Sequence, residues 1–167
     1  MNLNLRILLI IGSINIYSND VISSINNLIL NDLEFVQQTN INSRIDESVG
    51  KIYRKNNFIQ VEILKPSKEK YIIKDNLIEV HDFDFNQISY IDINDQDSYI
   101  LSLLKNGIDT NSVKKISINT FVIDSINNSF EVEFKSEDEF VISYKDNMNF
   151  RNTINFKSIN KHWILYW

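Results

Sequence analysis

The sequence predicts a mainly β (α+β) domain in which one strongly curved antiparallel sheet, or a barrel, carries two short helices. Apolar and polar residues alternate along most of the chain, turn signals separate the alternating runs, and only two stretches show helical spacing. Consecutive hairpins of this kind pair into a single curved sheet. The 167 residues are enough for one domain with its own core.

The composition is that of a globular protein and argues against nucleic-acid binding. Hydrophobic residues make up 43% of the chain and charged residues 23%. The formal net charge is −5, and the sequence contains no basic stripe. A nucleic-acid-binding protein needs such a stripe to displace counterions. We therefore expect no nucleic-acid partner.

The first residues have the layout of a secretory signal peptide. Arg6 precedes an apolar run at residues 7–16, and Ser18 is a small residue at which cleavage is expected. The run is shorter than the about 20 apolar residues of a membrane-spanning helix. The alternative is a buried N-terminal helix or strand. The sequence thus predicts a signal peptide at residues 1–18, a single domain at residues 19–167 and a soluble periplasmic product.

An amphipathic helix is expected directly after the signal peptide. Val21, Ile25 and Leu28 have helical spacing, and residues 18–20 offer three suitable N-caps. From Leu33 onward the apolar period changes to two, which is typical of strands. Strands are then expected at residues 33–37, 51–54, 58–64, 70–74, 77–81 and 87–93. Asp75-Asn76 predicts a tight hairpin, because asparagine tolerates the positive φ that such turns require.

A second helix is expected in the middle of the chain, at residues 98–106. Asp97 or Ser98 can cap its start, and Gly107 can end it in the left-handed conformation. Strands resume at residues 115–124, 129–135, 139–145 and 153–158. Asn127-Asn128, residues 136–138 and Asp146-Asn147 are the turn signals between them.

The signatures of catalytic and metal sites are absent from the sequence. His81 and His162 are the only two histidines, and neither has the spacing of a metal ligand. The acidic stretch at residues 92–97 fails as a calcium loop, because Asp97 stands where glycine is needed and Leu103 where glutamate is needed. There is no glycine-rich phosphate loop and no nucleophile elbow. We expect no enzyme activity, no catalytic residue, no metal and no cofactor.

Several short motifs follow one another in order over nearly the whole chain after the expected signal peptide. They are Phe35-Val-Gln37-Gln, Gly50-Lys-Ile52-Tyr53, Lys65-Pro66, Asp75-Asn76-Leu77-Ile78, residues 98–104, and the segment from Asp146 to Phe156 with its Asn152-Thr153-Ile-Asn-Phe156 end. This succession resembles the LolA family, the periplasmic carriers of outer-membrane lipoproteins. The family pattern runs approximately F-x-Q, G-x-x-Y, a loop Arg-Pro, a later Pro, D-G-x-x-L-W-x-Y, a lid helix with paired aliphatic residues, and N-x-x-T-x-I-x-F.

The chain departs from that pattern in three places. Arg54-Lys55-Asn56-Asn57 stands where the family has Arg-Pro, so the family's latch arginine has no clear counterpart. Leu77-Ile78-Glu79-Val80 is aliphatic where the family strand is rich in aromatic residues. The chain after Phe156 is short, so the last family strands are missing or reduced to residues 163–167.

The resemblance implies a fold and a task. The fold is an incomplete, unclosed antiparallel β-barrel, with an N-terminal helix and a mid-chain lid helix over the hollow. The task is that of a soluble periplasmic chaperone, which shelters the acyl chains of lipoproteins in a hydrophobic cavity and carries them from the inner to the outer membrane. The implied partners are acylated lipoproteins, an inner-membrane ABC-type release complex and an outer-membrane lipoprotein receptor. That receptor would carry a lipidated N-terminal cysteine, and this chain has no cysteine. A monomer is expected.

The candidate site residues follow from the strands and the helix that the resemblance assigns to the hollow. The expected lining of the lipid-binding cavity is Ile59, Val61, Ile63, Ile72, Ile78, Leu101 and Leu104. Ile100 and Leu103 belong to the expected lid helix, and Arg54 or Lys55 is the expected latch on its C-terminal carbonyls. Each lining residue can equally be an ordinary core residue. The alternative function is a periplasmic half-barrel sensor or protein-interaction module without lipid transport.

Overall fold

The structure is a computed structural model that describes residues 20–93, 99–124 and 129–159. The predicted signal peptide at residues 1–18, His162, the turn at Asn127-Asn128 and the reduced strand at residues 163–167 lie outside the described residues. Within the described ranges, no helix combines the length and the apolarity that a membrane crossing would need.

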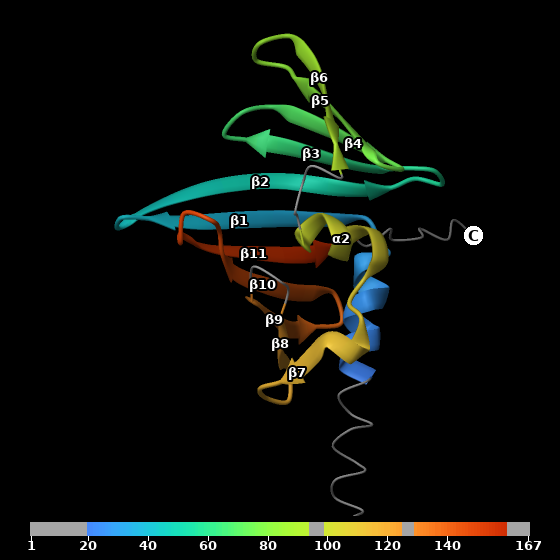
Figure 1. The fold of residues 1–167 in the computed structure, drawn as a ribbon, viewed down its shortest axis with the longest axis vertical. Coiled ribbons are helices and arrows are strands. Elements are labelled where there is room, and N and C mark those ends of the chain that lie inside the picture. The colour runs from blue at the N-terminus through green and yellow to red at the C-terminus, as the bar shows by residue number, and fades with distance from the viewer. Residues whose placement is uncertain (1–19, 94–98, 125–128, 160–167) are drawn as a thin grey trace, which may run out of the picture.

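One antiparallel sheet of eleven strands makes up most of the fold (Figure 1). Its strand order is β6-β5-β4-β3-β2-β1-β11-β10-β9-β8-β7, so β6 and β7 are its two ends and the described sheet does not close. The strands are β1 Leu33–Ile41, β2 Arg44–Arg54, β3 Ile59–Lys65, β4 Glu69–Lys74, β5 Leu77–Asp82, β6 Gln87–Asp92, β7 Val113–Lys115, β8 Thr120–Asp124, β9 Ser129–Ser136, β10 Glu139–Lys145 and β11 Arg151–Ser158. The prediction of a mainly β, unclosed antiparallel architecture is confirmed.

Strand β1 joins the two halves of the chain at the middle of the sheet. It pairs with β2 on one side and with β11 on the other, so Phe35 lies between Gly50 and Phe156. All other neighbouring strands follow one another along the chain. Only the β1–β11 pair therefore requires the two ends of the domain to meet.

The two helices pack against the same face of this sheet, on the right in Figure 1. The first covers residues 20–29 and the second is α2, Tyr99–Asn106. The first helix buries Ile22, Ile25, Leu28 and Ile29 against aromatic residues of the sheet. Leu103 and Leu104 of α2 join the same cluster. Val21 is only partly buried and lies at the margin of this apolar face.

A pair of hydrogen bonds fixes the end of α2 to the first helix. The Asn26 side chain accepts from the backbone N–H of Ile108 at 2.7 Å and donates to the Ile108 carbonyl at 3.1 Å. Gly107 ends α2 with φ 75, and a Cβ added there would lie 2.8 Å from Asn26 Oδ1. A glycine at this position therefore serves both the left-handed turn and the close approach of Asn26.

Several local predictions needed correction. The strand expected at residues 33–37 extends to Ile41, and the strand expected at residues 51–54 begins at Arg44. The single strand expected at residues 115–124 is instead two short strands, β7 and β8. A turn separates them, in which the N–H groups of Ile116 and Ser117 donate to the Thr120 carbonyl at 2.9 and 3.1 Å. Ile116 and Ile118 are two-thirds exposed, so their apolar character did not indicate a buried strand. The hairpin at residues 75–76 is present, but the positive φ of 49 belongs to Asp75.

Candidate functional site

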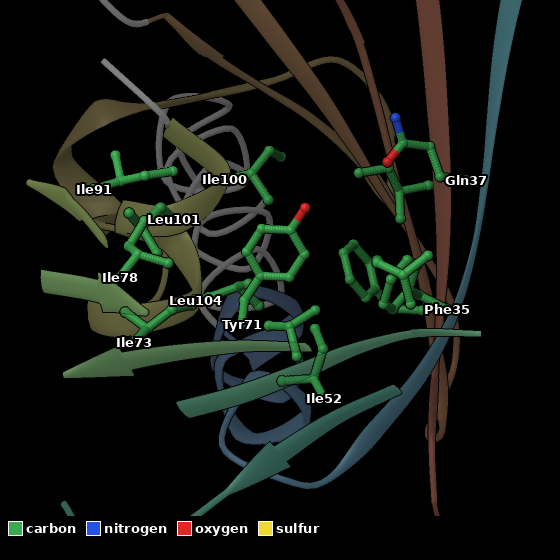
Figure 2. Close-up of a pocket in the computed structure, with 14 residues that line it drawn as sticks. Phe35, Gln37, Ile52, Tyr71, Ile73, Ile78, Ile91, Ile100, Leu101 and Leu104 are labelled. Atoms are coloured by element: carbon green, nitrogen blue, oxygen red, sulfur yellow. The ribbon is translucent and has the colours of Figure 1, made fainter. Parts of the chain in front are cut away.

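An apolar cavity of about 320 Å³ lies between α2 and one half of the sheet. Its wall consists of Phe35 and Gln37 of β1, Ile52 of β2, Val61 and Ile63 of β3, Tyr71 and Ile73 of β4, Ile78 of β5, Ile91 of β6, Ile100, Leu101 and Leu104 of α2, and Ile154 and Phe156 of β11. In Figure 2, Ile78, Ile91 and Leu101 stand on one side, Phe35 and Gln37 on the other, and Tyr71 between them.

Strand alternation explains why these residues share one face. Along a strand every second side chain points to the same side, and directly paired residues of neighbouring strands do so too. Val61 pairs with Tyr71, Ile73 lies beside Ile78, and Ile78 pairs with Ile91. Two neighbouring rows of side chains therefore cross this half of the sheet on the side of α2: Ile59-Ile73-Ile78-Ile91 and Val61-Tyr71-Val80.

The cavity separates two hydrophobic clusters. The larger contains both helices and the aromatic residues of β1 and β8–β11. The smaller consists of Ile73, Ile78 and Leu101. Leu104 belongs to the larger cluster and Leu101 to the smaller, so α2 bridges the two, and both residues also line the cavity. The helix thus contacts the sheet on either side of an unfilled space.

The structure places most of the predicted lining residues in the cavity wall. Val61, Ile63, Ile78, Leu101 and Leu104 all line it, as does Ile100 of the expected lid helix.

Ile59, Ile72 and Leu103 are not among the wall residues. Ile59 is partly buried and packs against both clusters at the end of β3. Ile72 was misplaced by one residue, because it alternates with Tyr71 and Ile73, which both face the cavity. Leu103 is completely buried and belongs to the larger cluster. Leu103 thus packs on the core, whereas Ile100, Leu101 and Leu104 line the cavity.

The structure does not bring either predicted latch residue to α2. The backbone N–H of Arg54 donates to Asp32 Oδ1 at 2.7 Å, and burial lowers the pKa of its guanidinium while Asp32 opposes that shift. The Lys55 ammonium lies 5.4 Å from the ring centroid of Tyr53. Among the described residues neither side chain forms a hydrogen bond with α2. The residue that ties α2 to the sheet is Lys105, whose ammonium donates to the Asp75 carbonyl at 2.7 Å.

Two polar side chains in the wall are satisfied by neighbours. The Gln37 amide donates to Asn152 Oδ1 at 3.2 Å, and Asn152 is itself buried between β1 and the β10–β11 turn. The Tyr71 hydroxyl donates to Glu69, and burial, followed by that hydrogen bond, raises the pKa of Tyr71. The tyrosine therefore stays neutral at physiological pH, and the wall offers no charged group to a ligand.

Sequence reasoning missed eight wall residues, four of which show strand alternation in the sequence. They are Phe35, Gln37, Ile52, Tyr71, Ile73, Ile91, Ile154 and Phe156. Phe35 and Gln37 alternate on β1, and Ile154 and Phe156 alternate on β11, so their common face was visible in the pattern. The pairing of β1 with β11 was not, and this pairing places Ile154 and Phe156 of β11 at the cavity.

Gly50 shapes the wall where β1 and β2 pair. A Cβ added at Gly50 would lie 2.5 Å from Cζ of Phe35. Since real contacts of this kind are essentially never so short, only glycine lets the Phe35 ring lie across β2. The Phe35 ring also packs on Phe156, with the ring centroids 6.2 Å apart.

Comparisons with known proteins give no functional name to this site. No protein-family profile and no curated protein matches the chain. An uncharacterized conserved protein from Thermus thermophilus is similar in structure, with a TM-score of 0.40 and 10% identity over 85% of this chain and 84% of that one. A redesigned beta barrel has a TM-score of 0.33 and 11% identity over 81% of this chain and 96% of its own. Likeness at this level says nothing of function. Among the described residues, no group of three metal-ligating side chains is arranged to hold an ion.

Replacing Ile73 by alanine should destabilise the protein more than replacing Ile72. Ile73 is 6% exposed and packs against Ile78 and Leu101. Replacing a buried isoleucine with alanine lowers the free energy of unfolding by about 2–5 kcal/mol. Ile72 points to the opposite face of β4, so its replacement should cost less. Urea unfolding of both variants measures the difference. Equal losses, or a larger loss for Ile72→Ala, would mean that the assigned register of β4 is wrong.

Proposed function

We propose that this protein is a periplasmic chaperone of the LolA kind, which shelters an acyl chain of a lipoprotein and carries it from the inner to the outer membrane. The observation that carries the proposal is the apolar cavity, whose wall contains twelve purely hydrophobic side chains beside Gln37 and Tyr71. An acyl chain must be shielded from water and needs no hydrogen bonds to its binding site. An apolar wall provides such shielding.

The cavity volume supports partial shelter of a single chain. At about 320 Å³ it is near the lower end of the range for ligand pockets, roughly 300–1,000 Å³. A methylene group is comparable in size to a water molecule, whose share of liquid volume is about 30 Å³, so about ten methylenes fit. At roughly 0.8 kcal/mol each they contribute about 8 kcal/mol, which is a micromolar affinity before the costs of binding. Such a ligand is held and can still be released.

Helix α2 is suited to act as the lid of this cavity. Its Ile100, Leu101 and Leu104 face the space, and Lys105 holds it to the β4–β5 turn by one exposed hydrogen bond. The same, C-terminal end is also fixed by Asn26, through Ile108 just after the helix, and this attachment is the proposed hinge. An outward movement of α2 that breaks the Lys105 contact and keeps the Asn26 contacts would open the cavity and retain the hinge. The proposed partners are the acylated cargo, an ABC-type release complex and an outer-membrane receptor.

A protein-interaction module is the second candidate function. It is favoured by exposed apolar side chains on the β5–β6 hairpin: Phe83 is 57% exposed, Phe85 74% and Tyr90 64%. Native mass spectrometry separates the two candidates, because a carrier purified after export retains an acylated ligand and a module without lipid transport does not.

Filling the cavity should weaken acyl binding without unfolding the protein. In Val61→Phe the larger side chain occupies the space beside Tyr71, because Val61 lies in the wall. We expect displacement of a fluorescent fatty acid by palmitate to weaken by about tenfold or more, corresponding to about 1.4 kcal/mol. Val36→Phe is the matched control, since Val36 is exposed on the other face of β1. Unchanged palmitate affinity in a folded Val61→Phe protein would refute the carrier function.

Removing the Lys105 contact should accelerate exchange of the bound chain. Lys105→Met keeps the apolar stem and loses the hydrogen bond to Asp75, which as an exposed contact is worth about 0.5–1.5 kcal/mol. Release of a fluorescent fatty acid, followed by stopped-flow mixing, should be roughly 2–10 times faster. Lys74→Met, beside the same turn, serves as the control. A release rate equal to that of the control would show that Lys105 does not hold a lid.

A further inference from the structure

Strand β6 presents an open backbone edge on the cavity half of the sheet. Among the described strands it pairs only with β5. The Ile93 N–H donates to the Asn76 carbonyl at 2.8 Å, and the register pairs Ile91 with Ile78 two residues earlier. In an antiparallel pair the hydrogen-bonded positions alternate. The backbone groups of Ile88 and Tyr90 therefore point away from β5, toward the open side.

This edge lacks the protection that the opposite edge has. The other end strand, β7, has only three residues and carries Lys114 and Lys115, which are devices that discourage strand addition. Strand β6 has six residues, and only the last of them, Asp92, is charged. Ile88 is 57% exposed and Tyr90 64%. An edge of this kind is suited to bind an extended peptide by main-chain hydrogen bonds.

The same strand also belongs to the proposed acyl site. Ile91 lines the cavity, whereas Ile88 and Tyr90 lie on the other face of β6. Because Ile91 is itself a residue of β6, the open backbone of that strand adjoins the cavity wall.

We propose that β6 binds, as an added strand, the peptide segment that directly follows the acylated residue of the cargo. The inference rests on the proposed function, because the acyl chain in the cavity holds the peptide beside β6. Such tethering raises the effective concentration of the peptide to roughly millimolar, so a few main-chain hydrogen bonds suffice. Recognition through the backbone is independent of side chains, which suits a carrier of many different cargo proteins.

The proposed occupant is the cargo peptide rather than a second copy of this chain. Two copies each carry a formal charge of −5, which opposes their association. A second copy would also lack the tether that an acyl chain provides. Sedimentation analysis distinguishes the two occupants. A dimer that forms without cargo, and that Tyr90→Pro converts to monomers, would overturn the proposal.

The ligand side is tested with three synthetic probes in isothermal titration calorimetry. They are palmitic acid, an N-palmitoylated heptapeptide of serine, threonine and valine, and the same lipopeptide with N-methyl groups on alternate residues. We expect the plain lipopeptide to bind about ten times more tightly than palmitic acid, as a few net hydrogen bonds allow, and N-methylation to abolish that gain. Equal affinities of palmitic acid and the plain lipopeptide overturn the inference and leave the carrier function standing. Failure of palmitic acid itself to bind overturns the carrier function and the inference with it.

The protein side is tested with Tyr90→Pro and Tyr90→Thr. Proline at an edge position whose N–H faces outward is tolerated in a strand and removes one donor from the binding edge. Threonine keeps the backbone N–H donor and, like proline, removes the tyrosine ring. Tyr90→Pro should lose about tenfold in lipopeptide affinity and keep its affinity for palmitic acid. Tyr90→Thr should retain most of the gain. Equal lipopeptide affinities of the two variants would contradict a main-chain role for β6.

Discussion

The packing of α2 against two separate hydrophobic clusters is the constraint from which the cavity follows. Leu104 is buried with the aromatic core of β1 and β8–β11, and Leu101 is buried with Ile73 and Ile78 at the other end of the sheet. A helix of eight residues is about 12 Å long, so it can contact both clusters and cannot fill the space between them. The sheet is curved and the two helices cover only part of one face. The space left between α2 and the sheet is the apolar cavity.

Much of the fold was predictable from the sequence because the strand period is short and repeated. The strands from residue 58 to residue 93 and the helix that ends before Gly107 were predicted to within one residue at each end. The split of β7 from β8 was not, because exposed isoleucines at positions 116 and 118 resemble strand residues. The length of the β1–β2 hairpin was also underestimated, since its polar outer half offers no buried face.

The candidate site was predictable in composition and less so in detail. Strand alternation alone gives the correct face for Val61 and Ile63, and a shift of one residue explains why Ile73 lines the cavity in place of Ile72. The wall contributed by β1 and β11 depends on a pairing over more than a hundred residues, which no local pattern encodes. The expected latch failed for a related reason: Arg54 interacts with Asp32, and the cation that reaches the β4–β5 turn comes from α2 itself.

Helix α2 has one firm and one weak hydrogen-bonded attachment. Asn26 holds its end by two hydrogen bonds in a partly buried position, whereas the Lys105 contact is exposed. This asymmetry, with a cavity too small to shelter a whole acyl chain, suits the loading and release that we propose. The central claim is that the cavity receives the acyl chain. Isotope-filtered NMR of the protein with palmitate tests it most directly: the account predicts nuclear Overhauser effects from the palmitate methylenes to the methyl groups of Val61, Ile73 and Ile78. Effects confined to the exposed Ile88, or none at all at saturating palmitate, would contradict it.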